Sequence, residues 1–295
     1  MSLQKVRIAL DWYPNTLHAG LLLAVENGYY AEQGLEVELL SVTDDGYACY
    51  PLDKLLQGKA DIGMAPTEHG FYYNEVKQTE KLMAIGAVNA ADASAVSYKL
   101  GHGISRPKDL DGKVIACYGT YFEEQIMQAM IKADGGQGVF TVSKPGKLEL
   151  WDHFTSGQAD ACWMFPCWEG ALAAATGTAL GTFKLSDYGI PYAQSPVFFV
   201  KEAFVAEYGS TIQRFITATA KGYHQVVRDT EASLSTLLSM DMVPVKHEAV
   251  WRVGLETLKH QILNENGLWG AYNTTLADTW QEWLLDAGCL ERVLA

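Results

Sequence analysis

Apolar and polar positions alternate with two different periods along the first forty residues. Val6–Leu10 is a short apolar run that ends at a polar turn, which is typical of a buried strand. Apolar residues then recur at helical spacing from Leu17 to Val25, and Gly34 ends that segment. Leu35–Leu39 alternates as a second strand. The order strand, helix, strand predicts a β-α-β unit with parallel pairing and a right-handed crossover.

The alternation of strands and helices continues to about residue 200. Further strands are expected at 61–65, 82–88, 95–99, 114–118, 159–165 and 196–200, and helices at 52–57, from 120 onward, at 148–155 and at 168–175. Thr120 and Glu123 have the spacing of a capping box, and Gly135 closes the same helix. The last hundred residues are largely helical. These elements predict an α/β fold with mostly parallel sheets.

No Gly- or Pro-rich linker separates two contiguous halves of the chain. This pattern favours a domain inserted into another domain, with two chain crossings near 95–99 and 192–196. The expected division is a first lobe of residues 1–94 plus 197–295 and a second, inserted lobe of residues 95–196.

Composition narrows the class of protein. The 295 residues are 48% hydrophobic and 19% charged, and the formal net charge is −13. A globular protein is indicated, and neither nucleic acid nor an anionic membrane is expected as the main partner, because both require clustered Lys and Arg. No apolar run reaches the roughly 18–20 residues of a membrane-spanning helix. The strand-like Val6–Leu10 begins too early for a signal peptide, so export would require a segment outside this sequence.

Familiar catalytic and metal-binding motifs are missing from the sequence. The five cysteines are scattered, and no His stands close to Cys162 or Cys167 to complete a zinc pattern. There is no G-x-G-x-x-G after the first strand, no phosphate-binding G-x-x-x-x-G-K-[ST], no H-E-x-x-H and no G-x-S-x-G. We therefore expect no metal and no cofactor, but these missing motifs do not by themselves exclude an enzyme.

Four loops combine polar and aromatic residues just beyond predicted strands. They are residues 11–18, 66–69, 118–121 and 163–170. In parallel α/β sheets, ligands bind outside the carboxyl ends of the strands, so these loops are the candidate binding site. The third loop precedes a helix whose free N–H groups are suited to an anion or a carbonyl.

Each residue of these loops also has a structural explanation. Asp11 and Asn15 are suitable caps for the following helix, and Glu169 lies in a first helical turn, where any Glu interacts well with the helix dipole. Tryptophans are commonly core residues, and buried histidines are commonly hydrogen-bonded structural residues. This explanation applies to five residues of the loops, namely Trp12, Trp163, Trp168, His18 and His69. The recurrence of similar loops in both lobes favours the functional interpretation.

The sequence resembles a known family at several of these places. The resemblance rests on five segments, which are L-D-W-Y-P-N-T-L-H-A-G at 10–20, A-V-E-N-G-Y-Y-A-E-Q-G-L-E-V-E at 24–38, G-K-A-D-I-G at 58–63, G-T-Y-F-E-E at 119–124 and D-A-C-W-M-F-P-C-W-E-G at 160–170. They are similar to ABC-transporter binding proteins for thiamine pyrimidine precursors, within the group of sulfonate-, nitrate- and pyrimidine-precursor-binding proteins. The D-W-x-P-N-x-x-H and W-x-F-x-x-W-E-G pieces resemble the formylaminopyrimidine binders.

The resemblance implies a periplasmic-binding-protein fold of the second type, with two lobes that close by a hinge around a ligand. It also implies aromatic rings that sandwich a pyrimidine, with Trp12 and Tyr118 as stacking residues, and a carboxylate that pairs with its amino group, namely Glu169. The complete expected ligand-binding set is Asp11, Trp12, Asn15, His18, Glu68, His69, Tyr118, Trp163, Trp168 and Glu169.

The expected function is therefore capture of a small pyrimidine, such as formylaminopyrimidine, for an ABC importer. The expected partners are the permease and ATPase subunits, and the expected location is periplasmic or extracellular and membrane-associated, without a direct membrane span.

Two alternatives keep the fold. The related thiamine-pyrimidine synthase uses pyridoxal phosphate held by a Lys four residues before a donor His. Here His69 is present, but Ala65 stands at the lysine position, and residues 189–196 lack the synthase's cysteine cluster. The expectation that the chain is not an enzyme rests on these two departures from the synthase pattern. The second alternative is a sulfonate or another small aromatic ligand. The candidate loops contain no Arg or Lys, which disfavours an obligate anion site.

Overall fold

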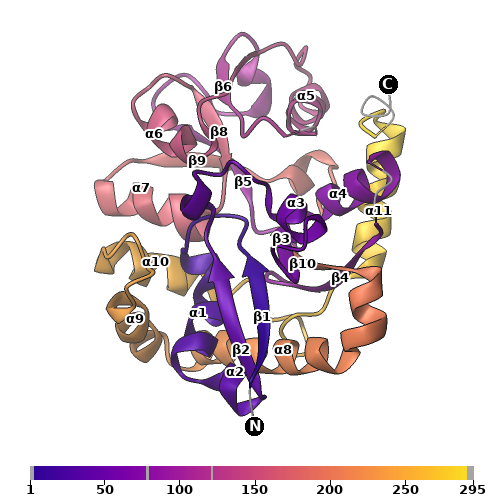
Figure 1. The fold of residues 1–295 in the computed structure, drawn as a ribbon. Helices are drawn as coiled ribbons and strands as arrows, with labels where there is room; N and C mark the ends of the chain where they lie inside the picture. Colours follow the sequence, from indigo (N-terminus) through magenta and orange to yellow (C-terminus); the bar gives the residue numbers. More distant parts are fainter. Residues whose placement is uncertain (1–2, 78–79, 121, 291–295) are drawn as a thin grey trace. The chain divides into compact units, whose positions relative to one another are not determined.

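Two compact units make up the chain in this computed structural model (Figure 1). The structure describes residues 3–77, 80–120 and 122–290, so Tyr121 of the third candidate loop lies outside the described residues. Unit 1 consists of the described residues within Met1–Asp92 and Gln194–Asn273. Unit 2 consists of those within Ala93–Ala193 and Thr274–Ala295.

Unit 1 contains a five-stranded sheet in the order β2-β1-β3-β10-β4. Its strands are β1 (Gln4–Ala9), β2 (Leu35–Leu40), β3 (Ile62–Ala65), β4 (Leu82–Ala87) and β10 (Val197–Lys201). β1 pairs in parallel with β2 and β3, whereas β10 runs antiparallel to β3 and β4. Every residue of β3 is buried, as its continuous apolar sequence requires.

Unit 2 contains a second five-stranded sheet in the order β7-β6-β8-β5-β9. Its strands are β5 (Ala95–Lys99), β6 (Val114–Ala116), β7 (Thr141–Ser143), β8 (Ala161–Met164) and β9 (Leu180–Phe183). β6 is parallel to β7 and β8, and β5 is antiparallel to β8 and β9. The two sheets therefore have the same topology.

The antiparallel strand has the same origin in both sheets. β5 is the first strand after the chain leaves unit 1, and β10 is the first strand after it returns. Each lies fourth in its sheet and is the source of the two antiparallel pairings there. The expected α/β class with mixed sheets is observed, with a larger antiparallel share than the strand–helix alternation predicts.

Helices surround the strands in both units. Those of unit 1 are α1 (Ala19–Glu26), α2 (Tyr29–Glu32), α3 (Pro51–Leu56), α4 (Thr67–Phe71), α8 (Glu202–Arg228), α9 (Thr230–Ser239) and α10 (Glu248–Leu258). Those of unit 2 are α5 (Glu123–Ala133), α6 (Leu150–Thr155), α7 (Ala171–Thr176) and α11 (Thr274–Asp286). No helix among the described residues is long and apolar enough to cross a membrane.

Two glycines allow α1 to pack closely against α8, the long orange helix in Figure 1. A Cβ atom on Gly222 would overlap the carbonyl oxygen of Gly20, and one on Gly20 would overlap the ring of Tyr223. The Tyr223 hydroxyl donates to the carbonyl of Leu17 at 2.6 Å. This contact fixes α1, and with it the preceding candidate loop, on the body of unit 1.

One buried side chain joins the three segments of unit 1 at which the chain changes unit. Gln194 donates from Nε2 to the carbonyls of Asn89 (2.9 Å), Ala90 (3.3 Å) and Ala271 (2.9 Å). Its Oε1 accepts the N–H of Asn273 at 2.7 Å. Gln194 is 2% exposed, and its amide binds four backbone groups, of which that of Asn89 belongs to a buried residue and those of Ala271 and Asn273 to exposed residues. These segments lie immediately before or after the unit boundaries.

The expected division of the chain differs from the observed one at the C-terminus. The sequence-based division assigns residues 274–295 to the first lobe, but α11 belongs to unit 2. The physical reason is aromatic packing, because the ring of Trp280 lies 5.1 Å from that of Tyr192 and is fully buried. The other boundaries fall after Asp92 and Ala193, close to the expected crossings.

The predicted elements are otherwise present, with two strands and one cap in error. The sequence pattern misses β7 and β9, because they are short strands without an apolar run. The capping box at Thr120 is also wrong, since α5 begins at Glu123 and Phe122 is its N-cap. The backbone N–H and the hydroxyl of Thr120 both donate to the Glu123 carboxylate.

Candidate functional site

The first candidate loop of unit 1 is held by a short hydrogen-bond network. The Asn15 side chain caps the 3₁₀ turn Thr16–His18 by accepting the N–H of Leu17 at 2.8 Å. The backbone N–H of Asn15 donates to Nδ1 of His18 at 3.3 Å, and Nε2 of His18 lies 2.9 Å from Oδ1 of Asp11. These bonds assign the ring proton to Nε2, which donates it to Asp11. His18 is fully buried and orients the Asp11 carboxylate.

A row of aromatic rings extends from the same loop. The Trp12 ring lies 5.6 Å from Tyr13 and 5.8 Å from Tyr47, and the Tyr47 ring lies 6.2 Å from Tyr50. The Tyr47 hydroxyl donates to the backbone carbonyl of Asp11 at 2.8 Å. The loop after β2 is thereby joined to the loop after β1. The rings are inclined to one another by 35–63° and bring apolar faces and polar edges together, a combination suited to an aromatic ligand.

Two further residues of the expected set lie on α4, beside this row. Glu68 and His69 are 5% and 6% exposed, and the His69 ring lies 5.1 Å from the ring of Tyr50. Burial raises the pKa of Tyr50, and the negative charges of Asp11 and Glu68 raise it further. Tyr50 therefore keeps its proton at neutral pH.

The second group of expected residues lies in unit 2. The Tyr118 hydroxyl donates to the backbone carbonyl of Trp163 at 3.3 Å, which joins the loop after β6 to β8. The Trp163 ring lies 4.9 Å from that of Tyr192. Glu169 and Trp168 belong to a π-helical turn, Pro166–Gly170, that follows β8.

Glu169 contacts its own loop in this structure. Its Oε2 accepts the N–H of Phe165 at 3.0 Å, and the residue is 5% exposed. Trp168, the neighbouring residue, is 1% exposed. The turn therefore holds the carboxylate at the carboxyl end of β8.

The sequence pattern does not mark Glu123 as a buried acid. Glu123 is 3% exposed, and its carboxylate accepts the N–H of Tyr118 (3.0 Å), the N–H of Thr120 (3.3 Å) and the Thr120 hydroxyl (3.2 Å). Burial raises the pKa of Glu123 to about 7, although these hydrogen bonds act in the opposite direction. A Glu at the start of a helix is common, so its position alone does not indicate burial.

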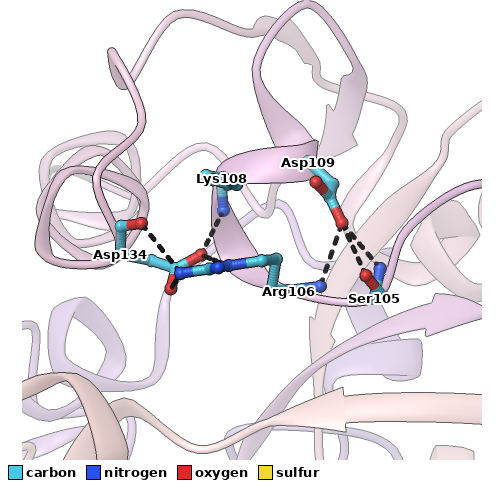
Figure 2. A network of polar contacts seen from close by, with 5 residues as sticks. All are labelled: Ser105, Arg106, Lys108, Asp109 and Asp134. Carbon is cyan, nitrogen blue, oxygen red and sulfur yellow. Dashed lines mark hydrogen bonds and ion pairs between the residues drawn. The ribbon is translucent and has the colours of Figure 1, made fainter.

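The helix that carries Glu123 is also fixed at its opposite end, as Figure 2 shows. Asp134, which follows α5, accepts from Nε of Arg106 at 2.8 Å and from the N–H of Lys108 at 3.0 Å. The guanidinium of Arg106 lowers the pKa of Asp134 to about 2. Asp109 accepts the N–H and hydroxyl of Ser105, both at 2.9 Å. Both ends of α5 are thus held by carboxylates.

The raised pKa of Glu123 predicts a pH-dependent stability. The folded-state value lies above the ordinary value of 4.5, so the stabilisation is complete below about pH 4.5 and is lost as the pH rises through about 7. Between about pH 5.5 and about pH 8.5, the wild type is expected to lose about 2 kcal/mol of unfolding free energy relative to Glu123→Gln, which does not ionise. Urea unfolding at both pH values measures this difference.

The matched control for this experiment is Glu124→Gln. Glu124 occupies the next position of the same helical turn and pairs with Lys144 at 2.8 Å, at 39% side-chain exposure. The stability difference between the wild type and Glu124→Gln should change much less with pH. An equal pH response of the two variants would contradict the assignment.

The structure thus brings the expected residues together in two groups. Asp11, Trp12, Asn15, His18, Glu68 and His69 lie in unit 1, and Tyr118, Trp163, Trp168 and Glu169 lie in unit 2. Their roles in binding stay predictions. Tyr47 and Tyr50 are absent from the set expected from the sequence, although both lie in the loop after β2, which begins at the same sheet edge.

Metal-binding chemistry has no candidate within the described part of the chain. No group of three or more His, Cys, Asp or Glu side chains there has the arrangement to hold a metal ion. Cys117 and Cys162 are buried thiols, and burial raises the pKa of both.

Comparison with known proteins identifies the family. The chain belongs to the NMT1/THI5-like family, whose model matches residues 15–233. A formylaminopyrimidine-binding protein of Halalkalibacterium halodurans is 28% identical over 286 residues, which cover 95% of this chain and 84% of that protein. A 4-amino-5-hydroxymethyl-2-methylpyrimidine phosphate synthase of Saccharomyces cerevisiae is 23% identical over 239 residues, which cover 78% of this chain and 69% of that protein.

The fold is shared with solved binding proteins. The periplasmic aliphatic sulphonate binding protein SsuA from Escherichia coli superposes with a TM-score of 0.73 at 14% identity, over 99% of this chain and 89% of that chain. This likeness, together with the two sheets of equal topology, confirms the expected periplasmic-binding-protein fold.

Proposed function

We propose that this chain is a solute-binding protein that captures a small pyrimidine, such as formylaminopyrimidine, for an ABC importer. The observation that carries the proposal is the aromatic row Trp12–Tyr47–Tyr50 beside the Asp11 carboxylate in unit 1. A flat ring with an amino group fits such a surface, because the ring stacks and the amino group donates to a carboxylate. The formylaminopyrimidine-binding relative, which matches 95% of the chain, supports this choice of ligand.

The residue roles form part of the proposal. Asp11 receives the ligand's amino group on Oδ2, because His18 already occupies Oδ1. Trp12 in unit 1 and Tyr118 in unit 2 are the proposed stacking residues, and Glu169 is the proposed partner of an amino group. Stacking contributes about 1–3 kcal/mol per ring and a hydrogen bond to a charged group about 1.5–3 kcal/mol. One stack and two such bonds approach the roughly 8 kcal/mol of micromolar binding.

The remaining expected residues have supporting roles in this proposal. Asn15 and His18 fix the Asp11 loop, Trp163 and Trp168 form apolar walls of unit 2, and Glu68 is a polar contact. The partners are a permease and an ATPase, and the protein works outside the cytoplasm, as the periplasmic origin of its structural relative supports.

Pyridoxal-phosphate-dependent synthesis is the second candidate, and synthase relatives at low identity raise it. Ala65 is the last residue of β3, and His69 stands four residues after it, where the synthase pattern has its donor His. Ala65 has no amine to form a Schiff base with an aldehyde cofactor, and residues 189–196 contain no cysteine. These two substitutions favour binding without chemistry.

A thermal-shift screen tests the proposal. The compounds are formylaminopyrimidine, hydroxymethylpyrimidine, thiamine, pyridoxal phosphate and methanesulfonate. We expect saturable stabilisation by an aminopyrimidine. Stabilisation by sulfonates alone would overturn the pyrimidine assignment, and a yellow Schiff-base absorbance with pyridoxal phosphate would establish the synthase alternative.

The residue-level arm of the screen is Glu169→Gln. The amide keeps an oxygen for the N–H of Phe165 but removes the negative charge, so affinity for the aminopyrimidine should fall about 10- to 100-fold. Glu149→Gln, at an exposed position of unit 2 outside the candidate loops, is the matched control and should bind like the wild type. Unchanged affinity of Glu169→Gln would remove Glu169 from the ligand contacts.

A further inference from the structure

The loop after β6 presents a cluster of hydrogen-bond donors. Gly119 has a φ of +76°, a left-handed conformation that turns successive backbone N–H groups toward one side. The donors are the N–H of Tyr118, the N–H of Thr120 and the Thr120 hydroxyl, and together they bind the two oxygens of one carboxylate. A concave arrangement of this kind, ahead of a helix, ordinarily holds a phosphate, sulfonate or carboxylate.

Here an internal carboxylate fills the donor cluster. The Glu123 side chain accepts all three hydrogen bonds, at 3.0, 3.3 and 3.2 Å, and is shielded from water. The adjacent strand repeats the arrangement, because the N–H of Phe165 after β8 is taken by Glu169 at 3.0 Å. Two neighbouring strand ends therefore carry a built-in carboxyl group at positions where a parallel sheet usually offers donors to a ligand, and that of Glu123 is mainly ionised above its raised pKa of about 7.

Lys144 lies beside this loop, but its ion pair is with Glu124, at 2.8 Å, and not with Glu123. An anionic ligand at this sheet edge would meet N–H groups that are already occupied. Above about pH 7 it would also meet the negative charge of Glu123. A neutral or amino-bearing ligand would meet no such repulsion.

We propose that Glu123 is a specificity residue: its carboxylate occupies the donor cluster of residues 118–120 and thereby excludes phosphate- and sulfonate-bearing ligands from this edge of unit 2. The inference deepens the proposed function, on which it rests for the amino-bearing ligand. In this proposal a single side chain, that of Glu123, causes the rejection of anions. Anions are rejected because the donors are already occupied as well as because cations are scarce.

The test is chemical rescue of Glu123→Ala in the full chain. Truncation frees the three donors and leaves space for a small anion, so formate should bind and stabilise the variant. At tens of millimolar formate, against sodium chloride at equal ionic strength, we expect a rise of about 3 °C in the unfolding midpoint of Glu123→Ala. Inorganic phosphate should also stabilise this variant. The wild type and the matched variant Glu124→Ala should show neither response.

Failure of Glu123→Ala to respond more than Glu124→Ala would overturn the proposal. A second measurement needs no variant: saturable stabilisation of the wild type by methanesulfonate or phosphate, beyond that of chloride, would overturn it as well. The formate rescue is independent of the pyrimidine screen, whereas stabilisation of the wild type by methanesulfonate overturns the proposed ligand as well only where no pyrimidine stabilises the protein. A wild type that binds neither pyrimidines nor anions, together with a rescued Glu123→Ala, would refute the proposed ligand and leave the role of Glu123 in anion exclusion standing.

Discussion

Replacement of Gly222 by alanine is expected to destabilise unit 1 by about 3 kcal/mol or more. The added Cβ would overlap the carbonyl oxygen of Gly20 and lie 2.8 Å from its carbonyl carbon. These are backbone atoms of α1, so relief requires the two helices to separate. Separation would also break the hydrogen bond from Tyr223 to Leu17. The loss greatly exceeds the roughly 1 kcal/mol that alanine gains over glycine in helix propensity.

The matched control lies on the same helix. A Cβ added to Gly209 would meet no atom within 4 Å beyond its own helix, so Gly209→Ala should be neutral or stabilise the protein by up to about 1 kcal/mol. Thermal unfolding followed by circular dichroism measures both variants. Equal midpoints for Gly222→Ala and Gly209→Ala would refute the close packing of α1 on α8.

Gln194→Leu is expected to destabilise the protein by about 1–3 kcal/mol. Leucine has a similar volume but leaves the carbonyls of Asn89 and Ala271 and the N–H of Asn273 without the amide that binds them. Asn89 is buried, and a buried backbone group left without a partner costs about 1–3 kcal/mol. Ala271 and Asn273 are exposed, so water replaces part of the hydrogen bonding that they lose.

Urea unfolding measures this loss, and Gln213→Leu is its control. Gln213 is exposed on α8 in the same unit, and its substitution should change the free energy of unfolding by less than about 0.5 kcal/mol. If Gln194→Leu behaved like Gln213→Leu, the amide would have no role in joining the three segments.

Local sequence patterns predict the buried strands well, because their apolar runs reflect burial directly. β1, β3 and β10 lie where apolar runs predict them. β7 and β9 are short, contain polar or glycine residues and depend on pairing with distant strands, so no local pattern marks them. The assignment of α11 to unit 2 depends on Trp280 meeting Tyr192, a contact between residues almost ninety positions apart.

The candidate site shows the same limit. The sequence indicates the loops, since each follows a strand of a parallel β-α unit. It does not indicate which polar atoms already have a partner. The two ring nitrogens of His18 and the carboxylate of Glu123 are engaged by groups of their own loops. Such contacts depend on exact backbone geometry, which residue types alone do not specify.

The position of β10 has a consequence for synthesis of the protein on the ribosome. β10 lies between β3 and β4, yet more than a hundred residues separate it from β4 in the chain. At about 5–20 residues per second, β4 waits about 5–20 s for the strand that attaches it to its sheet. All five strands of the second sheet emerge during that interval. The strands of the inserted sheet are therefore all synthesised before β10, and until then the edge of β3 that binds β10 has no strand paired with it.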